Sequence, residues 1–460
     1  MCTQISASQK EFFAEGDAQT IQNAVDYAKK TGTNRVVIPR FNARTGENIW
    51  NIEKAVLLPS DITIIIEDAH LRLCEGIFDN IFRNENCLTT KGNTMAGEQH
   101  NINIIGSGNA LLDGGLHNGL VEQMHRDNPE KYPRLSVNLL IFLHNVRDFR
   151  ISGLYIKESR WWSICCIYCR YGKISDIDFE MHATSENQDG IDLRIGCEYI
   201  TIENITGMTG DDTVALTALP FDDLVPETAL HVEGKSFDIH DVNIRNITSS
   251  THGCYLIRFL CEDGAKEYNI TVENVHDTGK TISGAVITFG MANTYFVKDH
   301  PRRMGDFRNV TLRNISTNAQ RGIVFNEPMQ DVFLENFQTY GRNEVGVTFT
   351  RSFSCDNVVL RNVSLRSNED TFNAAINSTK DFLPEELKGL RFENIRVGKP
   401  GYLYRRYNFD IKDIVYDGVS EGIFSGDSAT LDSAYGRYHK FSLGQEITNR
   451  PKDSRVDAKK

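Results

Sequence analysis

The sequence predicts an all-β protein that folds as a single-stranded parallel β-helix, a solenoid with a capping helix near its N-terminus. Two observations predict the solenoid. Short runs rich in β-branched residues recur along most of the 460-residue chain, and polar residues suited to turns separate them at repeated intervals. One amphipathic stretch before the first run predicts the helix that covers the open end of the stacked coils.

The helix is expected from Asp17 to Lys30, within a cap that spans residues 15–35. Asp17 is the expected N-cap and Gly32 the expected stop signal. The residues expected on the buried face are Ile21, Ala24, Val25 and Ala28. The chain then changes period, and Val36–Pro39 and Ile62–Ile66 are predicted to be buried strands.

Ten later segments share one pattern, in which a polar turn residue separates two short β runs. Their turn residues are 19 to 42 residues apart and are Gly153, Asp176, Asn204, Asn246, Asn274, Asn314, Asn336, Asn362, Asn394 and Asp413. A period of this length with longer insertions is typical of a solenoid. Asn suits such turns because it tolerates the left-handed backbone conformation, and stacked Asn side chains can form a ladder.

Composition narrows the classes of function. A net charge of −12 argues against a nucleic-acid partner, which would favour a basic surface. No apolar run reaches transmembrane length and the first residues carry no signal segment. We therefore expect no membrane partner and a cytoplasmic location if this start is the native one, or secretion if the start was shortened.

Cys166 and Cys169 form a CxxC pair without a second pair, in an apolar run that favours buried small side chains over a zinc or redox site.

Three insertions of more than a dozen residues interrupt the repeats, at 119–133, 217–235 and 290–305. Insertions in a solenoid tend to line one face, which is often the binding face. We expect one catalytic domain over residues 1–460, with a polar tail over 436–460.

The acidic residues of two neighbouring repeats predict a site. Asp189 and Asp211 are 22 residues apart, which is one coil, and Asp212 follows directly. Neighbouring parallel strands lie about 4.8 Å apart, so equivalent residues on successive coils become neighbours. One repeat later, His252 can join the same patch.

Such a patch suits inverting glycoside hydrolysis, in which one protonated carboxyl donates to the leaving oxygen and a carboxylate activates water. Crowding of like charges raises at least one pKa and keeps the acid protonated. Two alternatives stay open, because the carboxylates could hold a divalent cation and because Asp also favours turns for backbone reasons alone.

The motifs around these residues resemble those of glycoside hydrolase family 28, the polygalacturonase-like enzymes. Asn187-Gln188-Asp189 matches the family's N-x-D segment and Gly210-Asp211-Asp212 its G-D-D segment. His252-Gly253 matches its G-H-G segment, with Thr251 in place of the leading glycine. Gly106–Gly115 resembles its G-x-G-x-x-D-G segment, with one extra residue before the Asp.

A further stretch, Ser159–Trp162, resembles the family's S-P-x-W and puts Trp162 in the tryptophan place. The resemblance implies a right-handed parallel β-helix that works without metal or cofactor. It implies that Asp211 is the general acid, that Asp189 and Asp212 together activate the water, and that His252 tunes the acid or binds the sugar. Asn187, Gly253 and Trp162 would then contribute to substrate binding.

One departure concerns the substrate. The family's R-I-K segment, which supplies cations for a uronate carboxylate, should fall near Gly284–Phe289, where neither Arg nor Lys is present. Arg258, or Arg302 and Arg303 in the basic loop, could compensate, although such a loop can also be a solvated charged surface.

We therefore predict a hydrolase that cleaves pectin-type oligosaccharides, derived from galacturonan or rhamnogalacturonan. We expect it to act at chain ends, because the insertions wall the cleft. A polysaccharide lyase on the same scaffold and a non-catalytic carbohydrate-binding β-helix are the alternatives.

Overall fold

The computed structural model describes residues 4–116, 128, 138–182, 187–220, 230–280, 283–290, 302–367, 374–378 and 384–397. The chain divides into two compact units, Met1–Asn243 and Ile244–Lys460, with the boundary inside strand β17 (Ile239–Thr251). Each unit is described by itself, and the single domain expected from the sequence stays a prediction. The polar tail, the Asp413 turn and much of the three insertions lie outside the described residues.

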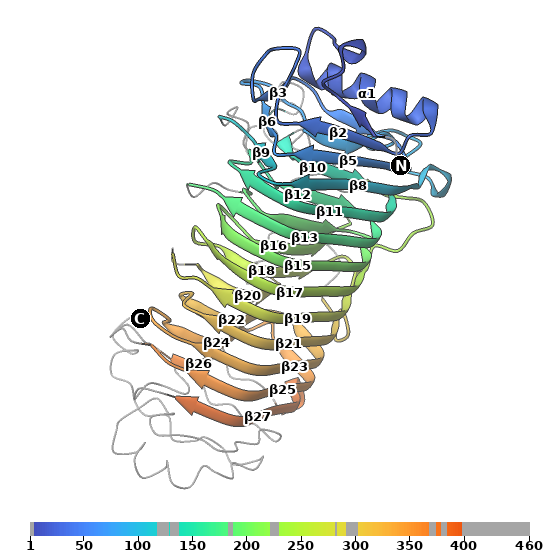
Figure 1. Cartoon of the computed structure of the whole chain (residues 1–460). Helices are drawn as coiled ribbons and strands as arrows, with labels where there is room; N and C mark the ends of the chain where they lie inside the picture. The colour runs from blue at the N-terminus through green and yellow to red at the C-terminus, as the bar shows by residue number, and fades with distance from the viewer. Residues whose placement is uncertain are drawn as a thin grey trace. The chain divides into compact units, whose positions relative to one another are not determined.

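The expected helix, α1 (Asp17–Thr31), forms near the start of the first unit and lies next to β2 (Arg35–Pro39) in Figure 1. The N-cap is Gly16 rather than Asp17. The Glu53 carboxylate accepts the N–H groups of Ala18 and Gln19 at 3.1 and 3.2 Å, so an acid from a later turn caps the helix. No helix in the described part of the chain is long and apolar enough to cross a membrane.

The apolar face and the end of α1 are as predicted. The four residues expected on that face are buried, namely Ile21, Ala24, Val25 and Ala28. Gly32 ends the helix in the left-handed conformation with φ 69°.

Two parallel sheets form the first unit. One contains, in order, β1 (Ile5–Ser6), β2, β5 (Ile62–Glu67), β8 (Gln99–Ser107), β11 (Val146–Lys157), β13 (Arg170–Glu180) and β15 (Glu198–Thr209). Short strands β3 (Trp50–Ile52), β6 (His70–Leu73) and β9 (Leu111–Asp113) pair beside it. The other contains β4 (Val56–Leu58), β7 (Phe82–Asn84), β10 (Ile141–His144), β12 (Ile164–Ile167), β14 (Ile191–Arg194) and β16 (Val214–Ala218).

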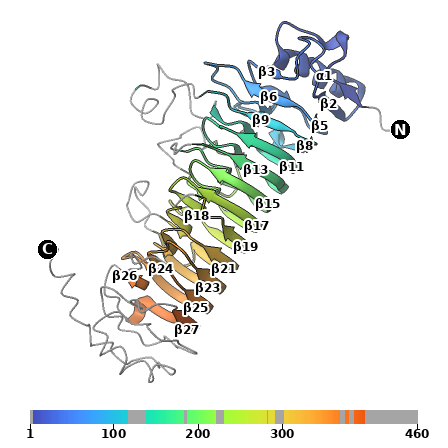
Figure 2. The same cartoon turned by 60° about the vertical axis from the view of Figure 1, so that its left-hand side comes forward.

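The second unit repeats this arrangement, as Figure 2 shows. Its long strands are β19 (Glu267–Asp277), β21 (Phe307–Thr317), β23 (Pro328–Thr339), β25 (Ser354–Leu365) and β27 (Leu387–Val397). Its short strands are β18 (Tyr255–Cys261), β20 (Ala285–Phe289), β22 (Arg321–Phe325), β24 (Val345–Phe349) and β26 (Ala374–Ser378). Between the sheets, Phe259, Phe289 and Phe325 stack at 4.7 and 5.5 Å between ring centroids. The predicted all-β parallel β-helix is confirmed.

The turn residues are confirmed wherever the structure describes them. All nine from Gly153 to Asn394 have positive φ, between 52° and 73°. Each bends a long strand without ending it, because the ladder continues on both sides of the left-handed residue. In the second unit the predicted ladder forms, and Asn336 donates to Asn314 at 2.9 Å while Asn362 donates to Asn336 at 3.2 Å.

The cysteines of the CxxC run are buried and unbridged. Cys165, Cys166 and Cys169 have no exposed surface. Burial raises the pKa of the Cys165 thiol, and the hydrogen bond with Cys169, together with burial, raises that of Cys166. They behave as small apolar side chains, as the sequence predicts.

Candidate active site

The two acidic segments of the first unit meet on neighbouring coils. Ile191 of β14 pairs with Val214 of β16, which places Asp189 level with Asp212. The Gly190 N–H donates to the Asp212 carbonyl at 2.8 Å. The N–H groups of Gly210 and Asp211 both donate to the Gln188 carbonyl at 3.1 Å. The structure therefore brings the N-x-D and G-D-D segments together, as their one-coil spacing predicts.

The three aspartates differ in exposure. Asp189 is 5% exposed and Asp212 is fully buried, whereas Asp211 is partly exposed. The Asp211 Oδ2 accepts the Asn187 N–H at 2.8 Å. Asn187 has φ 59°, a left-handed turn that Asn tolerates and that points this N–H at the carboxyl. Asp211 is thus oriented by the preceding coil and is the most accessible of the three.

A fourth carboxyl, Asp192, belongs to the same site, and the sequence reasoning missed it. Ile191 and Leu193 pack in the core, so alternation puts Asp192 and Arg194 on the opposite face of β14. Both are nonetheless buried, with 1% and 3% exposure. Burial raises the pKa of Asp192 well above its usual range; Arg194 opposes this rise, and the charges of Asp212 and Asp211 add to it. The alternation of apolar and charged residues in Ile191-Asp192-Leu193-Arg194 could have indicated this carboxyl from the sequence.

Trp162 is buried beside Arg194 and is not part of an exposed surface. It is 4% exposed and packs with Trp161, Phe142 and Val232 in one apolar cluster. The Arg194 guanidinium lies 4.8 Å from the centre of the Trp162 ring and donates to the Thr217 hydroxyl at 2.7 Å. This corrects the expected substrate contact, because the side chain supports Arg194 from within the core.

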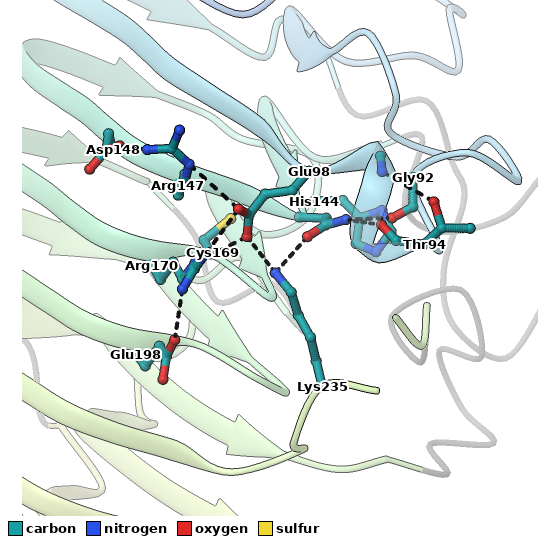
Figure 3. Close-up of polar contacts among 12 residues, drawn as sticks. Gly92, Thr94, Glu98, His144, Arg147, Asp148, Cys169, Arg170, Glu198 and Lys235 are labelled. Atoms are coloured by element: carbon teal, nitrogen blue, oxygen red, sulfur yellow. Dashed lines mark hydrogen bonds and ion pairs between the residues drawn. The ribbon is translucent and has the colours of Figure 1, made fainter. Parts of the chain in front are cut away.

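The described end of the 217–235 insertion is fixed by a polar cluster around Glu98, which Figure 3 shows. Arg170 donates twice to the Glu98 carboxylate, at 3.0 and 2.9 Å. Lys235 donates to Glu98 at 2.6 Å and to the Asn145 side chain at 2.7 Å. Burial alone would raise the pKa of Glu98, but the hydrogen bonds from Arg170 and Lys235 outweigh it and hold that pKa below its ordinary value.

This cluster gives the insertion a rigid base. Three residues before Lys235, Val232 is 2% exposed and packs in the cluster that contains Trp162. Sequence reasoning could not find the cluster, since Glu98 lies 72 residues from Arg170 and 137 from Lys235. The role of the insertion as a wall of the binding face stays a prediction.

The remaining predicted residues lie in the second unit. His252 and Gly253 follow β17, and Gly253 has φ 119°. Gly284–Phe289, where the R-I-K segment was expected, contains β20, and Arg258 of β18 pairs with Thr288 there. The Arg258 guanidinium lies 4.9 Å from the centre of the Tyr255 ring. Their closeness to the aspartates of the first unit stays a prediction.

Of the two arginines in the basic loop, Arg302 does not offer its charge to a ligand. Its side chain is 9% exposed and pairs with Glu262 at 3.5 Å and with Glu327, both buried. The expected substrate-binding role is therefore corrected for Arg302, which anchors the loop in the interior. Arg303 is exposed.

The first unit is thus a parallel β-helix that gathers carboxyl groups at the start of two neighbouring strands. Residues 83–220, which include Asp189, Asp211 and Asp212, match the family model of glycosyl hydrolases family 28. The resemblance drawn from the motifs is confirmed. No curated protein sequence matches the chain.

Solved structures share the fold at low sequence identity. The exopolygalacturonase of Thermotoga maritima is 14% identical with a TM-score of 0.53, over 86% of this chain and 92% of that one. A family 28 exopolygalacturonase of Yersinia enterocolitica is 13% identical with a TM-score of 0.52, over 91% and 78%. The A-module of an Azotobacter vinelandii mannuronan C-5 epimerase is 14% identical with a TM-score of 0.60, over 90% and 100%.

Proposed function

We propose that this protein is a glycoside hydrolase that cleaves pectin-type oligosaccharides from their ends by an inverting mechanism. The observation that carries the proposal is the placement of Asp189 level with Asp212, beside Asp211, within the segment matched by the family model. Two structural neighbours are exopolygalacturonases, which supports a uronate-containing substrate and action at chain ends.

In this mechanism Asp211 is the general acid, because it is the accessible carboxyl and has one oxygen fixed by Asn187. Its Oδ1 is buried and makes no hydrogen bond within the described residues, so we assign the transferred proton to the carboxyl group as a whole rather than to one of its oxygens. Asp189 and Asp212 bind the water and remove its proton as it attacks the anomeric carbon from the opposite face. Beside them, the Arg194 charge opposes the rise in the pKa of the buried Asp192 carboxyl.

The test compares the wild type with Asp211→Asn on a panel of pectic oligosaccharides. We expect kcat to fall by about 10² to 10⁴-fold, because the amide cannot donate the proton. Asp178→Asn, an exposed aspartate on β13, is the matched control and should keep wild-type turnover. Equal turnover by Asp211→Asn would refute the acid assignment. Time-resolved NMR of the first product should show the inverted anomer.

The same assay separates the alternatives. An unsaturated, ultraviolet-absorbing product and loss of activity with chelator would indicate a lyase. Exchange of a ring proton with solvent without cleavage would indicate an epimerase, the activity named for one structural neighbour. Binding without any product would indicate a carbohydrate-binding protein.

A further inference from the structure

The second unit contains a pocket of about 610 Å³ between the turn after β18 and the segment before β21. Its lining includes three cations, two acids and one apolar side chain, namely Lys266, Arg303, Arg308, Asp263, Asp306 and Met304. None of these belongs to the predicted catalytic set.

The three cations lie near the same carboxyl group, that of Asp306. Asp306 is 8% exposed, and its burial raises the pKa of the carboxyl. Lys266, Arg303 and Arg308 each oppose that rise, so all three charges lie within electrostatic reach of the same carboxyl. Because one of the two acids is buried and satisfied by the Arg303 backbone N–H at 2.7 Å, the accessible part of the pocket keeps an excess of positive charge.

Part of the pocket is also preformed, because contacts within the protein hold some of its side chains in place. The Arg308 guanidinium lies 3.9 Å from the centre of the Tyr268 ring and donates to the Gly305 carbonyl at 2.8 Å. Arg302, directly before Arg303, is held by the buried Glu262 and Glu327. The Arg303 guanidinium itself makes no hydrogen bond or ion pair within the described residues. A ligand would therefore meet the Arg308 guanidinium already held in place and the Arg303 guanidinium without such contacts. Binding then loses less side-chain conformational entropy than it would with two mobile arginines.

We propose that this pocket binds the carboxylate of a uronate residue in an oligosaccharide. Arg guanidinium groups match a planar carboxylate with two parallel hydrogen bonds, and Lys266 adds a point charge. Met304, which is 42% exposed, offers an apolar contact for a sugar ring. The saccharide class rests on the proposed function, whereas the preference for a carboxylate rests on the pocket alone.

The test observes the pocket directly, in Asp211→Asn protein so that the ligand is not consumed. The arginine Nε NMR signal of Arg303, identified by its loss in Arg303→Gln, should shift on titration with a galacturonate oligomer. The Arg313 signal is the internal control, because that arginine is exposed on β21, away from the pocket lining. Lys266→Gln should raise the Kd obtained from these shifts about tenfold, as expected for loss of one charge-assisted contact.

Two comparison ligands complete the test. The fully methyl-esterified oligomer should leave the Arg303 signal unchanged, because it lacks the carboxylate. No shift with the galacturonate oligomer, or an equal shift with the ester, would overturn the proposal. A shift with inorganic phosphate but not with the oligomer would also overturn it and identify a phosphate site. These outcomes do not depend on hydrolysis, so failure of the proposed function would be seen separately as absence of product from the wild type.

Discussion

At the scale of single residues, the first unit places two buried charged side chains, Asp192 and Arg194, next to the predicted catalytic carboxyls. A buried carboxyl among like charges favours its neutral form. The Arg194 charge, held by Thr217 and the Trp162 ring, opposes this. The balance gives Asp192 a raised pKa, which has a consequence for stability.

Asp192→Asn is expected to reduce the pH dependence of stability. A carboxyl with a raised pKa in the folded protein binds more protons folded than unfolded, so stability falls as pH rises from the unfolded pKa, about 3.9, to the folded one. The neutral amide does not incur this loss. The Tm of the variant minus the Tm of the wild type should therefore become more positive as pH rises. Thermal unfolding at a series of pH values measures this difference.

The matched control for this series is Asp178→Asn, whose side chain is exposed on the neighbouring strand β13. If both variants change the Tm alike at every pH, the burial of Asp192 is not the cause of the effect.

At the scale of elements, the Asn ladder of the second unit explains why the repeats contain asparagine. Asn336 has φ 55° and connects Asn314 to Asn362 through its side chain. The same residue thus provides the bend and the contact between coils.

Asn336→Ala should lower the free energy of unfolding by about 2 kcal/mol, because it removes two solvent-exposed hydrogen bonds and puts a Cβ-bearing residue without side-chain compensation in the left-handed region. Asn336→Gly should lower it by only about 1 kcal/mol, since glycine adopts that conformation without the steric cost. Urea unfolding measures both. Equal losses would show that the backbone conformation contributes nothing to the difference.

A second prediction at this scale concerns the polar cluster around Glu98, which holds the described end of the 217–235 insertion. Lys235→Met removes one cation from a Glu98 cluster in which both side chains are 14% exposed, and the loss should be about 3 kcal/mol. Lys173→Met is the control, because Lys173 is 43% exposed and its pair with Glu203 should contribute less than about 1 kcal/mol.

Limited proteolysis of the two lysine variants tests where the loss acts. Cleavage within the insertion should accelerate in Lys235→Met alone. Unchanged cleavage there would mean that the cluster does not hold the insertion.

The same elements show which features the sequence could predict. The bends repeat at every coil and depend on the conformational preference of one residue, so Asp176 and Asn204 are recognisable without any tertiary information. The meeting of Asp189 with Asp212 follows from the length of one coil. Glu98 and Lys235 are 137 residues apart in the sequence, and Trp162 packs in one cluster with Val232, so neither burial is encoded locally.

At the scale of the whole molecule, the predicted catalytic set is divided between the two units. Asp189, Asp211 and Asp212 lie in the first, and His252 lies in the second. The repeat spacing predicts that His252 follows the aspartates by one coil, and the resemblance to family 28 assigns it to the general acid.

His252→Gln should lower kcat at least about tenfold on a pectic oligosaccharide, because the acid loses its predicted partner. The double variant Asp211→Asn/His252→Gln should be no slower than Asp211→Asn alone, since His252 acts through the proton that Asp211 donates. His276→Gln, an exposed histidine on β19, is the control and should keep wild-type kcat. If the two single effects instead multiply in the double variant, His252 acts independently of the acid, and sugar binding becomes its role, visible as a change in KM.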